Sequence, residues 1–221
     1  KCNYCMKCAE VCPSGAIQAV GKRMSVSEVM DVVGRDASYY RRTGGGITLS
    51  GGEPLVQWQF ALGLLQEAKR RGFHTTLDTS GYTEWEVLDK VLNFADIVLY
   101  DIKHLDSVKH KEATGKPNEQ IIHNLKKTLE KGKSKVWLRH PVIPQFNDSQ
   151  EEVEDLCRFV LTLKPSVDKV SLLPYHKFGE MKYAATGKAY QWENISMIGD
   201  ERIQEFKKLF ESYDIKVDIG R

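Results

Sequence analysis

The stretch Ile47-Thr48-Leu49-Ser50-Gly51-Gly52-Glu53-Pro54 changes from apolar residues to glycines and a carboxylate within a few positions. Ile47–Leu49 has the pattern of a short strand, and a helical pattern over Trp58–Arg71 follows it. A second apolar run, His74–Asp78, comes directly after that helical pattern. This strand–helix–strand order indicates two neighbouring parallel strands, because parallel strands need a long crossover connection and antiparallel strands do not.

The same alternation continues to the end of the chain. Further strands are expected at Ile97–Ile102, Lys135–Val142, Val170–Leu173 and Ile215–Ile219, and further helices at Ser25–Arg42, Glu84–Asn93, Gln120–Lys131, Gln150–Leu163 and Asp200–Tyr213. Ser25 is a suitable N-terminal cap, and Gly72 and Gly132 stand where C-terminal caps are expected. The pattern predicts an α/β fold with a parallel sheet, as a barrel or partial barrel of (β/α) units that lacks its first strand.

Composition limits the classes of partner. The 221 residues are 41% hydrophobic and 28% charged, which suits one sizeable core with a small appendage. A net charge of +2 favours neither nucleic acid nor a membrane surface as a partner. No apolar run approaches the roughly 20 residues that span a bilayer. Clustered free thiols indicate a reducing compartment, so we expect a cytoplasmic protein.

Four cysteines, Cys2, Cys5, Cys8 and Cys12, open the chain and are followed by Pro13. This spacing is the bacterial ferredoxin run, whose fourth cysteine ligates the other cluster in two-cluster ferredoxins. The alternatives are a zinc knuckle or a disulfide framework. Zinc sites usually pair two cysteines with a second pair about a dozen residues or more away, and no such pair follows. We therefore predict that these four thiols ligate iron–sulfur clusters.

The position of this motif suggests how the chain is organised. Residues 1–22 are interpreted as a partial ferredoxin-like [4Fe–4S] module in which Ser14–Val20 forms a short turn and strand. Residues 23–221 are interpreted as the barrel domain. Because Lys1 directly precedes the first ligand, we expect further sequence upstream of it. The remaining cysteine, Cys157, has helical apolar neighbours and is expected in the core.

Polar residues follow five of the expected strands, at Ser50–Pro54, Asp78–Gly81, Asp101–His104, Arg139–Pro141 and Pro174–His176. The carboxyl ends of parallel strands meet at one edge, so these residues would surround a single mouth. Lys103 comes two residues after Asp101, which places both on one side of a strand. Arg139 lies in an apolar strand and would need an anionic partner there.

Each of these residues also has a purely structural interpretation. Gly51-Gly52 could simply turn the chain, although glycines at a strand end also let the backbone approach a ligand closely. His176 could be an ordinary structural histidine, and Lys109–Gly115 is interpreted as a solvated loop that could also touch a partner. Taken together, these residues describe a site for a zwitterion. A glutamate such as Glu53 or a backbone oxygen would face an amine, and a lysine or arginine would face a carboxylate. S-adenosylmethionine is a ligand that places an amino-acid moiety beside an iron–sulfur cluster.

The chain also resembles a known family. Its motifs Thr48–Leu55, Leu77–Gly81, Tyr100–Lys103, Val136–Arg139 and Leu172–His176 are similar to those of the glycyl radical enzyme activating enzymes, which are radical S-adenosylmethionine (SAM) proteins. The cysteine run resembles the subclass with a ferredoxin-like insert. The resemblance implies a partial (β/α)6-type radical SAM barrel, two auxiliary [4Fe–4S] clusters and a catalytic one. It also implies reductive cleavage of SAM to a 5′-deoxyadenosyl radical, which installs a glycyl radical on a partner enzyme.

The resemblance also implies roles for individual residues. Gly52, with Glu53 beside it, would contact the methionine amino group, and Asp101, Ile102 and Lys103 would lie along the methionine and ribose portion. The remaining matched positions are Asp78, Thr79 and Asp101 for a monovalent cation beside the methionine carboxylate, Arg139 for a basic residue near the active site, and His176 for the adenosyl part.

One departure from the family pattern is serious. The catalytic motif, C-x3-C-x2-C, is absent from the chain, so the resemblance implies that it lies upstream of Lys1 and no catalytic residue is assigned here. The implied reductant is flavodoxin or ferredoxin, and a monomer is expected. Two alternatives stay open: a radical SAM enzyme that acts on a small molecule, and a ferredoxin-type electron carrier without catalysis. The particular glycyl radical enzyme is not readable from the sequence.

Overall fold

The computed structural model describes residues 3, 5–187, 189–190 and 192–220, and its centre is a six-stranded sheet. The strands are β1 (Gly46–Leu49), β2 (His74–Thr79), β3 (Ile97–Asp101), β4 (Lys135–Val142), β5 (Lys169–Pro174) and β6 (Val217–Ile219). All neighbouring strands are parallel, and their order in the sheet is their order in the chain. The predicted parallel sheet is confirmed, with each strand close to its predicted place.

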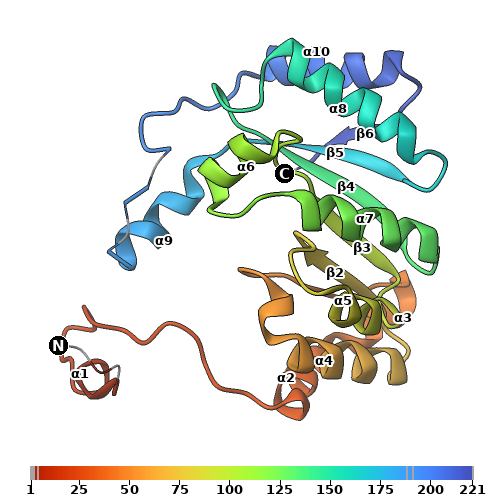
Figure 1. The fold of residues 1–221 in the computed structure, drawn as a ribbon. Coiled ribbons are helices and arrows are strands. Elements are labelled where there is room, and N and C mark those ends of the chain that lie inside the picture. The colour runs from red at the N-terminus through yellow and green to blue at the C-terminus, as the bar shows by residue number, and fades with distance from the viewer. Residues whose placement is uncertain (1–2, 4, 188, 191, 221) are drawn as a thin grey trace.

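The principal helices are α4 (Trp58–Arg70), α5 (Trp85–Leu92), α7 (Glu119–Lys131), α8 (Gln150–Leu163) and α10 (Asp200–Ser212). Figure 1 shows them around one side of the curved sheet. Strands β2, β3 and β4 alternate buried and half-buried residues, and their buried residues join the helices in one core that includes Leu77, Leu125, Leu138 and Phe206. The helices therefore cover one face of the sheet, and the half-buried residues lie on the other face.

The helix predicted over Ser25–Arg42 is divided into α2 (Val26–Val33), a 3-10 turn η1 (Gly34–Asp36) and α3 (Ala37–Thr43). Ser25 caps α2 as predicted, in a capping box with Glu28. The single helix was wrong because Gly34 has a poor helix propensity. In addition, the Arg71 guanidinium donates a hydrogen bond of 2.7 Å to the Met30 carbonyl in the last turn of α2.

Gly72 and Gly132 both follow helices with positive φ angles of 75° and 61°, so their predicted capping positions are confirmed. The segment Lys109–Gly115, predicted as a loop, is instead mostly helix α6 (Ser107–Thr114). Asp106 caps it by accepting hydrogen bonds from the amides of Val108 and Lys109. His110 is the buried residue of this helix, so the sequence carries no apolar period that would reveal it.

The smaller elements are α1 (Lys7–Glu10), the 3-10 turns η2 (Pro54–Gln57) and η3 (Lys177–Gly179), and α9 (Glu180–Ala185). Figure 1 shows α1 set apart from the sheet and joined to it by an extended segment. The strand predicted within Ser14–Val20 is wrong, because these residues are exposed and have no strand beside them to pair with. Within the described ranges, no helix has the length and apolar character needed to cross a membrane.

Candidate active site

A row of charged side chains lies at the carboxyl ends of β2, β3 and β4, on the face opposite the helices. Asp101 and Arg139 are direct partners in the register of β3 and β4. The Arg139 Nε atom donates to Asp101 Oδ1 at 2.8 Å, and a terminal nitrogen of the same guanidinium pairs with Asp78. The side chains of Asp78, Asp101 and Arg139 are 14%, 18% and 22% exposed. Arg139 therefore has the anionic partners that its position demanded, one on each of two strands.

Lys103 extends this row beyond the end of β3. Its Nζ atom lies 3.1 Å from Asp101 Oδ2, which confirms the ion pair expected from the two-residue spacing. The Lys103 side chain is one-third exposed, so some of the three N–H donors of its ammonium group can reach a ligand in the mouth. Burial raises the pKa of Asp78, although a hydrogen bond from Ser50 and the charge of Arg139 favour its ionised form.

Glu53 joins the loop after β1 to the end of β2. Its carboxylate accepts hydrogen bonds from Thr79 Oγ1 at 2.7 Å, from Ser80 Oγ at 2.7 Å and from the Ser80 amide at 2.9 Å. A carboxylate that already holds these donors acts as an anchor for the loop. Gly52, one residue earlier, is exposed, and a Cβ built on it meets no atom within 4 Å. Its backbone is therefore open to close approach by a ligand.

No residue with a Cβ fits at position 81 in place of Gly81. Its φ angle is 71°, and a Cβ at this position would lie 1.8 Å from the Tyr100 hydroxyl oxygen. That hydroxyl is fixed, because it donates a 2.7 Å hydrogen bond to the Ile121 carbonyl at the start of α7. The β2–α5 loop can follow this path only with glycine at position 81.

Two predicted site residues are placed differently from the charged row. The Ile102 side chain is 2% exposed and belongs to the core, so only its backbone can face a ligand. His176 follows β5, after the buried Tyr175, and is exposed at the same edge of the sheet. The hydrogen bonds described above join Glu53, Thr79 and Ser80 on one side of the mouth and Asp78, Asp101, Lys103 and Arg139 on the other.

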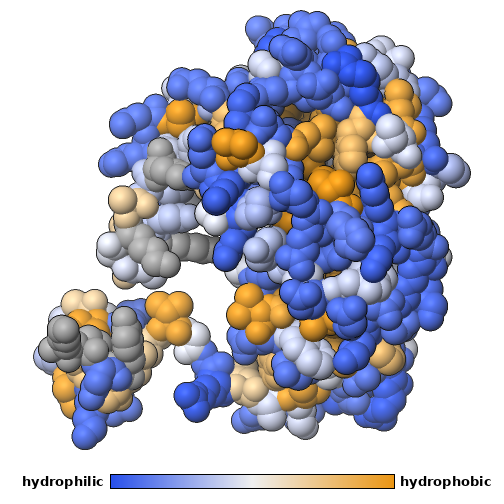
Figure 2. Space-filling model, in the orientation of Figure 1, coloured by the Kyte–Doolittle hydropathy of each residue, from blue (hydrophilic) through white to orange (hydrophobic). Residues whose placement is uncertain are grey.

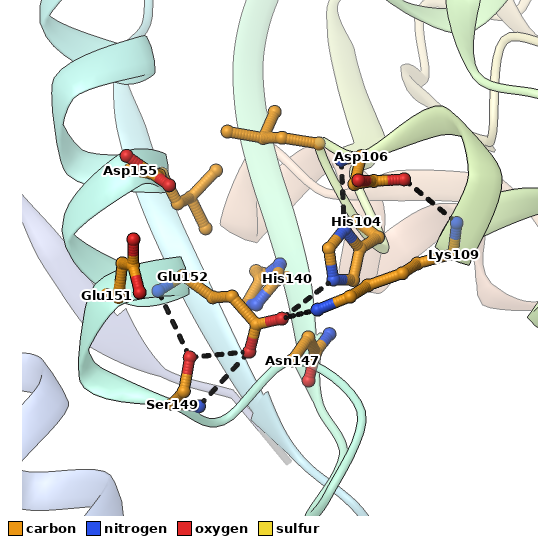
Figure 3. A pocket seen from close by; sticks show the side chains of 11 residues that line it. His104, Asp106, Lys109, His140, Asn147, Ser149, Glu151, Glu152 and Asp155 are labelled. Atoms are coloured by element: carbon orange, nitrogen blue, oxygen red, sulfur yellow. Dashed lines mark hydrogen bonds and ion pairs between the residues drawn. The ribbon is translucent and has the colours of Figure 1, made fainter.

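Behind the charged row, on the helix-covered face, lies a cavity of about 290 Å³. Figure 3 shows His104, His140, Asn147 and Glu152 around it, with α8 on one side and α6 on the other. Glu152 accepts hydrogen bonds from His104 at 3.2 Å and from Lys109. Burial works to raise the pKa of Glu152, but hydrogen bonds from Lys109, Ser149 and His104 outweigh it and hold the pKa at about 2. Apart from the polar residues at the strand ends, no pattern in the sequence indicates this network.

The predicted metal ligands are only partly within the described residues, since Cys2 lies outside them. Cys5, Cys8 and Cys12 are free thiols, and no three His, Cys, Asp or Glu side chains of the described part are gathered to hold a metal ion. The ferredoxin pattern assigns Cys5 and Cys8 to one cluster and Cys12 to another, so these three are not expected to converge. The amide of Ile17 and the hydroxyl of Ser14 lower the pKa of Cys12, which favours the thiolate that a metal needs. Cys157 is fully buried on α8, as predicted.

A comparison of the sequence with protein-family models matches residues 1–160 to one family, the radical SAM superfamily. The chain belongs to the radical SAM superfamily. This match spans the cysteine run and strands β1 to β4, including the charged row. The superfamily implies a [4Fe–4S] cluster and SAM as cofactors. The charged row and the open Gly52 backbone provide opposite charges and a close approach, which fit the zwitterionic end of SAM.

The relatives are activating enzymes. The isethionate sulfite-lyase activating enzyme of Oleidesulfovibrio alaskensis is 46% identical over 82% of this chain. The chain spans 59% of the length of that relative. The trans-4-hydroxy-L-proline dehydratase activating enzyme of Clostridioides difficile is 37% identical over the whole chain and 82% of its own length. The resemblance to the glycyl radical enzyme activating enzymes is thereby confirmed.

Solved structures agree on the fold. A domain of pyruvate-formate lyase-activating enzyme from Bacteroides vulgatus superposes with a TM-score of 0.67 and 26% identity, over 80% of this chain and 99% of that domain. A radical SAM methyltransferase from Sphaerobacter thermophilus superposes with a TM-score of 0.66 at 17% identity, over 94% of this chain and 60% of its own. The second likeness shows the fold alone. The radical SAM fold predicted from the sequence is confirmed.

Proposed function

We propose that this chain is the SAM-binding barrel of an activating enzyme that installs a glycyl radical on a partner enzyme. The row formed by Asp78, Arg139, Asp101 and Lys103 at the carboxyl edge of the sheet carries this proposal. A ferredoxin-type electron carrier has no need for four partly desolvated charges there, since each costs solvation free energy. A bound catalytic [4Fe–4S] cluster would supply the electron that breaks the C5′–S bond of SAM. The chain itself binds, orients and excludes water.

Within the row, the residues divide the work of binding. Arg139 is occupied by two carboxylates and fixes their positions, whereas the Lys103 ammonium, paired on one side with Asp101, keeps donors for the methionine carboxylate. The Gly52 backbone would receive the methionine ammonium, and His176 would contact the adenosyl part. Ile102 would contribute its backbone alone, because its side chain is in the core.

The finer parts of the proposal rest on the family resemblance and on the cysteine spacing. Residues 1–22 would be part of a ferredoxin-like module with auxiliary [4Fe–4S] clusters, held in this chain by Cys2, Cys5, Cys8 and Cys12, and residues 23–221 would be the barrel. Flavodoxin or ferredoxin would supply electrons to a monomer in the cytoplasm. A monovalent cation beside Asp78 and Asp101 stays a prediction, and the Arg139 guanidinium already bridges those two carboxylates.

Lys103→Ala in the intact, cluster-loaded protein tests this assignment. The variant removes a contact between a charged donor and the methionine carboxylate, so SAM affinity should fall by roughly tenfold to a hundredfold. The matched control is Lys111→Ala, because Lys111 is an exposed lysine of α6 away from the charged row. Titration calorimetry measures the affinity, and anaerobic release of 5′-deoxyadenosine with dithionite measures turnover. Equal affinities for the two variants would overturn the assignment of Lys103.

The partner requires a separate assay. An activating enzyme should produce a glycyl radical, detected by electron paramagnetic resonance, when it is mixed with a glycyl radical enzyme and SAM. Release of 5′-deoxyadenosine with small molecules but with no protein substrate would favour the small-molecule alternative. Absence of any SAM cleavage by the intact protein, with its clusters present, would favour the electron carrier.

A further inference from the structure

The backbone that carries Lys103 is held from behind by buried side chains. β3 ends at Asp101, so the next carbonyls leave the hydrogen-bonding ladder of the sheet. The Ile102 carbonyl accepts a hydrogen bond of 2.7 Å from His140 Nδ1, and the Lys103 carbonyl accepts one of 2.7 Å from Asn147 Nδ2. His140 is 5% exposed and Asn147 is 2% exposed. Two consecutive carbonyls of the site are therefore fixed by side chains that the mechanism has not used.

Asn147 makes more hydrogen bonds to this region than His140 does. Besides the Lys103 carbonyl, its Nδ2 atom donates to the Pro141 carbonyl at 2.7 Å. Its Oδ1 atom accepts from the Ile143 amide, also at 2.7 Å. Both N–H donors of the amide and one lone pair of its oxygen are used. Asn147 thus joins the segment after β3, which carries Lys103, to the end of β4, the strand that carries Arg139.

On the helix side, this segment is held both by the Ile102 side chain, which packs in the core, and by the two hydrogen bonds to its carbonyls. His140 and Asn147 line the cavity of about 290 Å³, and Figure 3 shows both facing it between α8 and α6. A cavity beside the backbone supplies fewer close contacts than a filled core, so the hydrogen bonds add to what packing provides there. Burial lowers the pKa of His140 to about 4, so this ring is neutral at pH 7 and its Nδ1–H can donate to the Ile102 carbonyl. The Asn147 hydrogen bond is therefore a direct restraint on the Lys103 carbonyl, one residue beyond the buried Ile102 side chain.

We propose that Asn147 is a positioning residue of the SAM site, which sets the place of the Lys103 ammonium by holding the Lys103 carbonyl to the end of β4. The proposal rests on the function proposed above. Asn147 makes no hydrogen bond to a side chain of the charged row, so its effect must pass through the Lys103 backbone. Loss of the restraint lets Lys103 move relative to Asp101 and Arg139, which weakens the binding of the methionine carboxylate.

Asn147→Asp is the sharpest test, because it keeps the size of the side chain and the acceptor for the Ile143 amide. It removes the donor to the Lys103 carbonyl and sets a carboxylate against two carbonyls. In the intact, cluster-loaded protein at pH 8, the Kd for SAM should rise at least about tenfold. At pH 6 the affinity should partly recover, since burial raises the pKa of the introduced carboxyl and its O–H can donate again.

The pH comparison needs the wild type as a reference. The titratable groups that line the same cavity are present in both proteins: His104, Asp106, Lys109, His140, Glu151, Glu152 and Asp155. The ratio of the two Kd values at each pH therefore isolates the introduced carboxyl. A purely structural loss of stability would lower the melting temperature without this pH-dependent return of affinity.

Ser134→Ala is the matched control. Ser134 Oγ donates a 2.7 Å hydrogen bond to the Ala95 carbonyl at the opposite edge of the sheet. This variant should lower the melting temperature and leave the Kd for SAM unchanged. If Asn147→Asp does not fold, Asn147→Ser, whose hydroxyl can keep one bond, should still raise the Kd severalfold. A wild type that does not bind SAM would overturn the proposed function, whereas binding by the wild type with an unchanged Kd in the variant would overturn the role of Asn147 alone.

Discussion

Arg139→Met should destabilise the barrel and do so in a pH-dependent way. The guanidinium lies between Asp78 and Asp101, which are 14% and 18% exposed. Breaking a buried ion pair costs about 3–5 kcal/mol, because one charge is left without a partner. Lys103 still neutralises Asp101, and both carboxylates keep some contact with water, so the loss should be about 2–3 kcal/mol at pH 7.5.

The pH dependence follows from Asp78. Burial already raises the pKa of this carboxyl, and removal of Arg139 raises that pKa further because the repulsion by Asp101 is no longer offset. A carboxyl whose pKa is higher in the folded state than in the unfolded state binds more protons when folded. Stability therefore increases as the pH falls through the window between the two pKa values. The deficit of the variant should shrink between pH 7.5 and pH 5.

Urea unfolding followed by circular dichroism measures both effects. Arg158→Met is the control, because Arg158 is half-exposed on α8 and pairs with surface carboxylates. Its loss should be below about 1 kcal/mol and nearly independent of pH. The double variant Asp78→Asn/Arg139→Met should recover part of the stability. A loss for Arg139→Met no larger than the control, or a deficit that grows on acidification, would refute the reasoning.

Two further predictions concern the backbone and the thiols. Gly81→Ala should lower the thermal midpoint sharply and abolish SAM binding, because the new methyl would meet the Tyr100 hydroxyl. Gly187→Ala, also at positive φ but with open space around it, should cost only the left-handed backbone strain of about 1–2 kcal/mol. In the cluster-free protein, iodoacetamide at pH 7.5 should label Cys12 quickly and leave Cys157 unlabelled until urea is added, because burial raises the pKa of Cys157 to about 12; mass spectrometry that finds Cys157 labelled first would contradict this.

The sheet was predictable because its strands are apolar runs with helical patterns between them, and because parallel strands place their carboxyl ends together. From this geometry alone, Asp78, Asp101 and Arg139 were predicted to lie together at one edge of the sheet. The spacing of Asp101 and Lys103 likewise predicted their ion pair. Each of these inferences depended on a period of two or on the order of elements, which the sequence carries directly.

The features that were not predicted depend on contacts that leave no periodic pattern in the sequence. Helix α6 is polar on nearly all sides and begins at the Asp106 cap, so neither its existence nor its place was visible. Asn147 donates to the Lys103 carbonyl, 44 residues away in the sequence, and a loop residue of this kind shows nothing unusual beside its neighbours. Glu53 was expected near an amine, which stays a prediction, and its contacts with Thr79 and Ser80 join positions 26 and 27 residues apart that no local pattern connects.

Arg139 and His140 are neighbours on β4 that project from opposite faces of the sheet. A slip of this strand by one residue would exchange them, placing an imidazole between Asp78 and Asp101 and a guanidinium against the helix layer. The charged row and the hydrophobic core thus depend on the same register of β4 in the sheet. A chain that folds with β4 in the wrong register loses both at once. A barrel with β4 out of register should therefore not bind SAM even weakly. SAM binding is then also a measure of correct strand register.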